Sequence, residues 1–183
     1  MHADVVKSWF GEQFNNLHPL LQELHVGGGQ LSGDVRISFG TGMAGLIGRR
    51  LAKKMRFPGP GTHQLRITIS HDIDGLFWKR SFNNQTPVTS LFKAVGNIES
   101  GYWLESTGPL EMKLTVDVVD GGWYWRCLSV RFLGMPVPKW LMPHTDAYKT
   151  IADDLYRFHV EFSLPIIGPL VSYEGLLELE KPQ

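Results

Sequence analysis

The stretch Leu76-Phe-Trp-Lys-Arg-Ser-Phe82 decides the fold, because its side chains alternate with the period of two that is typical of a β-strand. One face is apolar except for an arginine: it carries Leu76, Trp78, Arg80 and Phe82. A buried guanidinium needs a partner, since an unpaired buried charge costs several kcal/mol. The stretch therefore predicts an inward-facing strand that contributes one half of a buried ion pair.

The composition is that of a globular protein with no overall charge. The 183 residues fit a single domain, 1–183, large enough to bury roughly 70% of the surface that the unfolded chain exposes. Hydrophobic residues make up 43% of the chain and charged residues 20%, which argues against disorder. The 18 basic residues balance the 18 acidic ones, so we expect no nucleic-acid partner.

Cysteine usage and hydropathy bear on the compartment. Cys127 is the single cysteine, so an internal disulfide is excluded and a reducing compartment is expected. The first residues form no continuous apolar segment of the signal-peptide kind, and no apolar run approaches the ~20 residues that span a bilayer. The sequence thus predicts a cytoplasmic protein without a transmembrane segment.

Helices are expected in the first third of the chain, on either side of one strand. Apolar residues at three- and four-residue spacing predict a helix over Val5–His25, which Pro19 divides in two. Leu31–Phe39 alternates as a strand with one wet face. Met43–Met55 is expected to be a helix whose outer face is basic. That face is either solvated or in contact with an anionic lipid or an acidic partner.

The rest of the chain is strand-like and punctuated by turn signals. Strands are expected over 65–69, 76–82, 89–95, 102–107, 110–119, 123–133, 158–164 and 170–179. Asp146–Tyr156 is expected to be a short helix. The predicted fold class is α+β: a strongly curved antiparallel sheet or partly closed β-barrel of about eight or nine strands, packed on the helices of the N-terminal third. A helix-grip-like or a lipocalin-like shape fits this order of elements.

One glycine motif and two polar clusters invite a cofactor or a metal. Gly40-Thr-Gly-Met-Ala-Gly45 matches the G-x-G-x-x-G of dinucleotide-binding turns. However, the strand before it is amphipathic and an antiparallel series follows it, so we expect the glycines only to turn the chain into the helix. The clusters at 71–74 and 144–146 lack the spacing of metal sites. We therefore expect no cofactor, no metal and no catalytic residue that the sequence can assign.

A second charged residue shares a face with a tryptophan in the segment 102–107, where Glu105 lies two positions after Trp103. If both strands point their tryptophans inward, Arg80 and Glu105 can pair, with Tyr173 close enough to hydrogen-bond. The pair either ties strands together or anchors the head group of a ligand in an apolar cavity. The proline-rich loop Gly134–His144 would cover the cavity mouth or plug the core. The candidate ligand-binding residues are Arg80, Glu105, Trp78, Trp103, Tyr173 and Trp140.

Several motifs occur in a fixed order along the chain: Gly75-x-x-Trp78-x-Arg80-x-Phe82, Glu105-x-x-Gly108-Pro109-Leu110, Leu133-Gly134-x-Pro136-x-Pro138-x-Trp140-Leu141-x-Pro143 and Gly168-x-x-Val171-x-Tyr173-x-Gly175. Together they resemble a bacterial family, domain of unknown function 4166, over nearly the whole chain. Some of its members carry this domain behind a saccharopine-dehydrogenase-like or short-chain-dehydrogenase-like NAD-binding domain, which implies an oxidoreductase partner. The resemblance supplies no catalytic residues.

The expected function is non-enzymatic binding of a small apolar or amphipathic ligand inside the curved sheet, with the polar end of the ligand at Arg80 and Glu105. Two alternatives stay open. One is an accessory interaction domain that docks onto a dehydrogenase-like partner. The other is an enzyme that acts on a hydrophobic substrate with Glu105 as acid or base. The sequence determines neither the ligand nor the oligomeric state.

Overall fold

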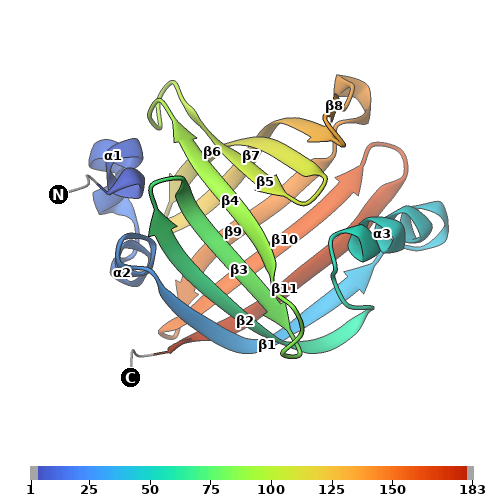
Figure 1. The fold of residues 1–183 in the computed structure, drawn as a ribbon, viewed down its shortest axis with the longest axis horizontal. Helices are drawn as coiled ribbons and strands as arrows, with labels where there is room; N and C mark the ends of the chain where they lie inside the picture. The colour runs from blue at the N-terminus through green and yellow to red at the C-terminus, as the bar shows by residue number, and fades with distance from the viewer. Residues whose placement is uncertain (1–3, 181–183) are drawn as a thin grey trace.

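A computed structural model describes residues 4–180 and shows a closed barrel of ten antiparallel strands (Figure 1). The strands of the barrel are β1 (Gly29–Phe39), β2 (Gly61–Asp72), β3 (Gly75–Phe82), β4 (Val88–Val95), β5 (Tyr102–Thr107), β6 (Leu110–Val119), β7 (Gly122–Phe132), β9 (His144–Ala152), β10 (Leu155–Leu164) and β11 (Gly168–Glu180). They follow the order β6-β5-β4-β3-β2-β1-β11-β10-β9-β7, and pairing of β6 with β7 closes the ring. The two-residue strand β8 (Met135–Pro136) extends β7 at its edge.

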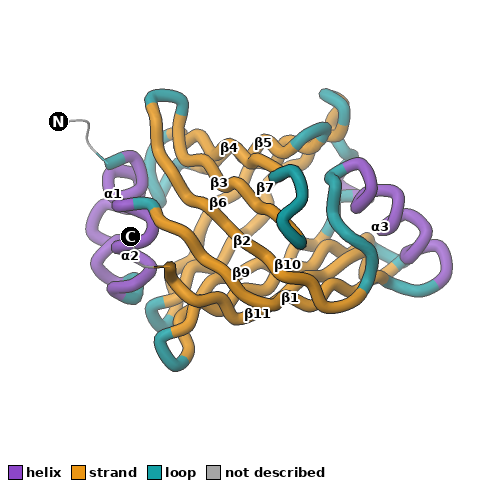
Figure 2. The backbone as a smooth tube through the Cα atoms, turned by 60° about the horizontal axis from the view of Figure 1, so that its bottom comes forward, coloured by secondary structure: helices purple, strands orange, loops and turns teal. Residues whose placement is uncertain are grey.

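Helices cover both ends of the barrel (Figure 2). At one end lie α1 (Val5–Phe10), the 3₁₀-helix η1 (Gly11–Asn16) and α2 (Pro19–Gly27); at the other lies α3 (Gly42–Lys54). The predicted division of the first helix at Pro19 is confirmed, because Pro19 opens α2, where the missing N–H leaves no hydrogen bond unmade. A second 3₁₀-helix, η2 (Lys139–Leu141), lies in the proline-rich loop.

Each end of the barrel is formed by the segments that connect the strands there. The α1/α2 end holds the helices α1, η1 and α2 and the turns 73–74, 96–101, 120–121 and 153–154. The α3 end holds the segments 40–60, 83–87, 108–109, 133–143 and 165–167. Because consecutive strands run antiparallel, segments distant in sequence meet at the same end.

The half of the barrel next to α1 and α2 is filled with aromatic side chains. Trp9 packs against Trp103 with ring centroids 5.5 Å apart, and Phe10 packs against Trp123 at 4.6 Å. All four side chains are buried. The apolar stripe predicted for the first helix thus plugs this end of the barrel.

Gly40 and Gly48 seat α3 directly on the backbone of β11. A Cβ at Gly40 would lie 1.8 Å from the carbonyl oxygen of Pro169, and one at Gly48 would lie 2.0 Å from that of Leu170. Only glycine allows this approach. The structure therefore accounts for Gly40 and Gly48 by close packing on β11, whereas the sequence predicted only a turn into the helix.

The prediction of a helix over Asp146–Tyr156 is wrong. Residues 144–152 form β9, a turn at Asp153-Asp154 follows, and β10 begins at Leu155. Three of the inward positions of β9, Thr145, Ala147 and Lys149, lack a large apolar side chain and only Ile151 carries one, so the alternation is hidden in the sequence. With this strand added, the barrel has ten strands instead of eight or nine.

Candidate functional site

The register of β3 confirms the pattern read from its sequence. Its burial alternates, with Leu76, Trp78, Arg80 and Phe82 pointing into the barrel. Strand β5 alternates in the same way and turns Trp103, Glu105 and Thr107 inward. The strand between them, β4, contributes the buried hydroxyl of Ser90, which lies opposite Trp78 on one side and Thr107 on the other.

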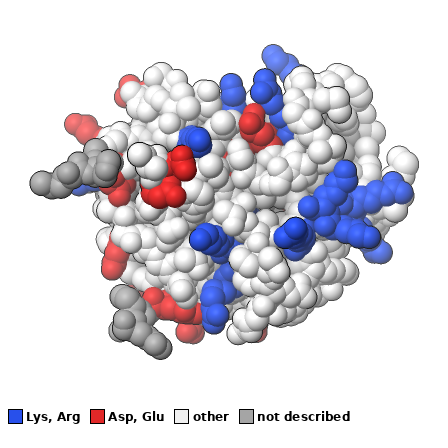
Figure 3. All heavy atoms as spheres, viewed as in Figure 1, with Lys and Arg blue, Asp and Glu red and all other residues white. Residues whose placement is uncertain are grey.

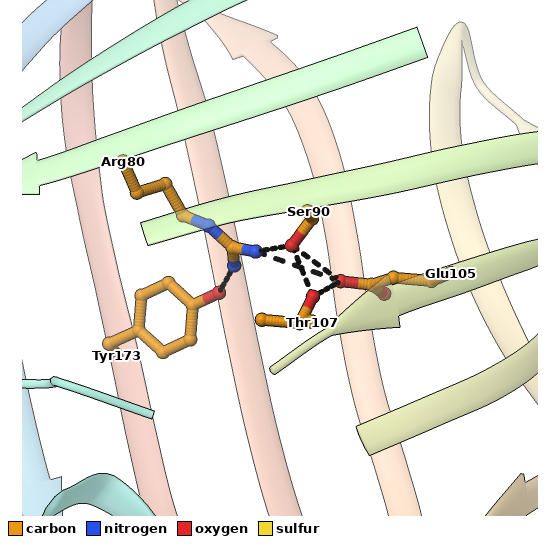
Figure 4. A network of polar contacts seen from close by, with 5 residues as sticks. All are labelled: Arg80, Ser90, Glu105, Thr107 and Tyr173. Atoms are coloured by element: carbon orange, nitrogen blue, oxygen red, sulfur yellow. Dashed lines mark hydrogen bonds and ion pairs between the residues drawn. The ribbon is translucent and has the colours of Figure 1, made fainter. Parts of the chain in front are cut away.

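These inward side chains form a buried polar network (Figure 4). Arg80 Nη2 lies 3.6 Å from Glu105 Oε1. The same carboxylate oxygen accepts hydrogen bonds from Ser90 Oγ at 3.1 Å and Thr107 Oγ1 at 3.0 Å. Arg80 also donates to Ser90 Oγ and, through Nη1, to the Tyr173 hydroxyl at 2.9 Å. The predicted ion pair of Arg80 with Glu105 and the predicted hydrogen bond between Arg80 and Tyr173 are confirmed.

The network keeps Arg80 charged although it is buried. Burial disfavours the guanidinium, but Tyr173 and Glu105 outweigh this effect, and the pKa of Arg80 is raised. Burial is also the main cause that raises the pKa of Tyr173, so its hydroxyl stays protonated. Arg80 still has a buried Nε atom without a hydrogen-bond partner among the described residues.

Lys149 is a second buried base, which the sequence reading missed because it placed this residue in a helix. Its side chain lies inside an aromatic box: Nζ is 3.9 Å from the ring centroid of Trp78, 4.1 Å from that of Trp123 and 5.1 Å from that of Trp125. Aromatic faces attract an ammonium ion. No carboxylate of residues 4–180 lies within ion-pair distance of Lys149.

The partner of Lys149 is His25 of α2. Lys149 Nζ donates to His25 Nε2 at 3.1 Å, while His25 Nδ1 donates to the carbonyl oxygen of Leu21 at 2.8 Å. Burial, together with the nearby Lys149, lowers the pKa of His25 well below its usual value, so the imidazole is neutral and can accept this bond. Burial likewise lowers the pKa of Lys149 well below its usual value; Glu105 opposes this shift and Arg80 adds to it.

A cavity of about 80 Å³ lies beside these groups, in the half of the barrel next to α3. Its wall is mostly apolar, and it also includes Arg80, Glu105, Lys149 and Tyr173. Other lining residues carry a buried polar atom without a hydrogen-bond partner in the described part of the chain: Trp78 Nε1, Thr145 Oγ1 and Tyr156 Oη. Such atoms are costly inside a protein unless a ligand or water satisfies them.

The structure brings four of the six sequence-predicted residues together at the cavity: Trp78, Arg80, Glu105 and Tyr173. Trp103 is fully buried in the packed half, where it contacts Trp9. Trp140 belongs to η2 on the surface, where it is 76% exposed. Neither tryptophan lines the cavity. Lys149, Tyr156 and Thr145 line it without having been predicted.

Between Asp4 and Glu180, no group of three or more His, Cys, Asp or Glu side chains is arranged to hold a metal ion. Within the same range, no helix has the length and the apolar character that crossing a bilayer requires.

The fold and the site define the class: a closed antiparallel barrel with a polar cluster beside an interior cavity. Residues 17–177 match the family described as Domain of unknown function (DUF4166). The match covers most of the chain, so the protein belongs to this family. Comparison with curated proteins and with solved structures found no match.

Proposed function

We propose that the protein is a non-enzymatic binding domain for a small amphipathic ligand whose anionic head group meets Lys149 and Arg80. The observation that carries the proposal is the buried amine of Lys149, which lines the cavity and has no acidic partner among the described residues. The interior thus holds two basic side chains, Arg80 and Lys149, against one carboxylate, Glu105. A carboxylate on a ligand would favour the charged form of Lys149, which burial disfavours, and would give this amine the acidic partner that it lacks.

The unpartnered polar atoms support a polar end on the ligand. Thr145 Oγ1 and Tyr156 Oη line the same cavity as Lys149 and have no partner within residues 4–180. A carboxylate can accept from the ammonium of Lys149 or from the Tyr156 hydroxyl, and Thr145, four residues along β9 from Lys149, offers a separate polar contact. A ligand that fills these positions removes desolvation penalties of roughly 1–3 kcal/mol for each group.

The size of the cavity limits what it holds in this conformation. Its volume of about 80 Å³ is well below the ~150 Å³ of an engineered apolar cavity that binds benzene. The head group of a ligand fits, but a longer apolar chain requires the wall to move. The wall on the side of α3 is formed by Leu51 and Ala52 of this helix, by Met55, which directly follows it, and by Phe57.

Native mass spectrometry of the protein purified from its own host tests the proposal directly, since a retained amphipathic acid is expected. Titration with octanoate, with octan-1-ol and octylamine as matched probes, tests the head group. Octanoate is expected to bind most tightly and to take up a proton, because an adjacent anion raises the pKa of a buried amine. Calorimetry in buffers of different ionisation enthalpy measures that uptake. Equal binding of the three probes would refute an anionic head group.

Replacing Lys149 by methionine separates binding from folding. Lys149→Met is expected to weaken octanoate binding roughly tenfold or more, since it removes a charged hydrogen bond. The same change removes a desolvated amine but leaves His25 Nε2 buried without its partner, so the free energy of unfolding is expected to change by less than about 2 kcal/mol. Lys79→Met, at an exposed position of β3, is the matched control and should change neither quantity. A loss of stability without loss of binding would contradict the role given to Lys149.

The two alternative functions stay predictions. An accessory domain for a dehydrogenase-like partner predicts co-purification with an oxidoreductase, the kind of partner that the family resemblance implies. An enzyme that uses Glu105 predicts that Glu105→Gln abolishes a turnover. In the structure, one oxygen of Glu105 is engaged by Arg80, Ser90 and Thr107, an arrangement that favours a structural or binding role over proton transfer.

A further inference from the structure

The net charge of zero conceals a separation of charge along the barrel axis. The segments of the α3 end contain no aspartate or glutamate, and their basic side chains are Arg49, Arg50, Lys53, Lys54, Arg56 and Lys139. In the described part of the α1/α2 end, Lys7 is the one lysine or arginine. The acidic side chains there are Asp4, Glu12, Glu23, Asp74, Glu99, Asp120, Asp153 and Asp154. Figure 3 shows the basic side chains gathered on the side of α3 and acidic ones on the side of α1 and α2. A field of this shape orients the molecule toward an anionic surface.

The α3 end also exposes large apolar side chains among its basic ones. Met43 and Leu46 lie on the outer side of α3 and are 71% and 52% exposed. The loops beside α3 add Leu133, Met135, Trp140 and Ile166. The α1/α2 end exposes Ile73 as well, but between Asp72 and Asp74. Basic residues interspersed with tryptophan and aliphatic side chains, without acidic ones, are typical of surfaces that bind the interface of a bilayer.

This end is also the one nearest the cavity. A surface groove runs between α3 and the β3–β4 turn, lined by Arg49, Lys53 and Arg56 on one side and by Asn84, Gln85 and Thr86 on the other. Ala52 and Phe57 line both the groove and the cavity, so they form the partition between them. An amphipathic molecule that leaves a bilayer at this point would pass from the basic groove into the barrel.

We propose that the α3 end docks on the surface of an anionic phospholipid bilayer, with the basic face of α3 at the head groups and Met43, Leu46, Trp140 and Ile166 inserted between them. The charge complementarity and the exposed apolar side chains favour a bilayer over a soluble acidic partner, which would leave the apolar tips in water. The docking does not depend on which ligand the cavity holds, and a failure to dock leaves the proposed ligand binding standing.

Vesicle flotation with the full chain tests the docking. Vesicles of phosphatidylcholine mixed with phosphatidylglycerol are expected to carry the protein, and vesicles of phosphatidylcholine alone are not. Added salt should release it, because exposed charges are screened within a Debye length of about 10 Å or less. Absence of binding to the anionic vesicles at low salt, with the protein folded by circular dichroism, would overturn the proposal.

Two double variants with the same change in net charge locate the surface. Arg50→Glu with Lys53→Glu reverses two exposed charges on α3 and should weaken vesicle binding at least roughly tenfold. Lys79→Glu with Lys93→Glu reverses two exposed charges on the barrel wall and should change it less than roughly twofold. Equal losses in the two variants would show attraction without a defined face and would overturn the proposal.

Trp140→Ala distinguishes a bilayer from a soluble polyanion. At 76% exposure the side chain contributes little to folding, but its loss should weaken vesicle binding severalfold and leave binding to polyglutamate or duplex DNA unchanged. If either polyanion binds as tightly as the vesicles and Trp140→Ala affects none of them, the α3 end is a surface for a soluble acidic partner and the bilayer proposal is wrong.

Discussion

The two halves of the barrel are built from the same alternating strands and yet differ in what fills them. In the half next to α1 and α2, helices insert Trp9 and Phe10 between Trp103 and Trp123, and the interior is packed. In the half next to α3, the helix lies across the end, and a cavity with buried polar groups is left. The interior of a closed barrel can therefore be either a packed core or a cavity. In this protein the helices at each end determine which of the two forms.

The strongest way to break this comparison is to truncate one large side chain in each half. Trp123→Ala should destabilise the protein by about 3–5 kcal/mol, since Trp123 is fully buried against Phe10 and His25. Phe162→Ala, at a half-buried position that lines the cavity, should cost roughly half as much or less. Chemical denaturation measures both. Equal costs would show that the two halves are packed alike.

A substitution of Arg80 tests the buried polar network in the half of the barrel next to α3. Arg80→Met should destabilise the protein by about 3 kcal/mol, because it leaves Glu105 buried without its cation. The double variant Arg80→Met with Glu105→Gln should recover part of that loss, since the uncompensated charge is then removed as well. A double-mutant cycle by denaturant unfolding measures the coupling. Additive losses would mean that the pair contributes no mutual stabilisation.

The boundary between the halves should respond to pH through His25, which faces Lys149 and His71. Its folded-state pKa lies well below the usual 6.5, mainly because of burial. Below pH 6.5 the unfolded state therefore binds a proton that the folded state does not, and stability falls as the pH falls toward the lowered pKa. The slope is at most about 1.4 kcal/mol per pH unit. His25→Gln should flatten this part of the stability curve; an unchanged slope would assign it to other groups.

The smallest expected change in stability is that caused by removing a surface tryptophan, Trp140, which is compared with the buried Trp123. Trp140→Ala should change the free energy of unfolding by less than about 0.5 kcal/mol, because the side chain is largely in solvent. Thermal unfolding measures it against Trp123→Ala. A loss as large as that of a core tryptophan would mean that the proline-rich loop plugs the barrel, one of the two roles that the sequence left open.

The wall of the barrel could be predicted from the sequence, and its closure could not. Alternation of apolar residues identifies β3, β5 and β6 almost residue by residue, because a large inward side chain stands at every second position. Closure depends on pairing of the first strand with the last, β1 with β11, and local periodicity carries no information on a pairing between segments so far apart in the sequence.

The candidate site was predicted in part, for the same reason. Arg80 and Glu105 were found because each interrupts an apolar face in a clear strand. Lys149 was missed because Thr145 and Ala147 share its face, so the lysine interrupts nothing. The available signal was the Asp153-Asp154 pair, which forms the turn between β9 and β10 and argues for a hairpin over a helix. Trp140 was placed near the mouth by its sequence context, although the structure leaves it in solvent.

Helix α3, which covers the cavity, is held by different kinds of contact along its two sides. Along the side of Gly40 and Gly48, the helix rests on backbone atoms of β11, which cannot rotate away. Beyond Ala52 it is held by side chains, chiefly Phe57, whose ring packs against Phe82 and Tyr173 with centroids 5.1 Å away in each case. The first side is therefore fixed by backbone contacts and the second by side-chain packing alone. Tyr173 joins this packing to the polar network, because its ring contacts Phe57 and its hydroxyl accepts a hydrogen bond from Arg80.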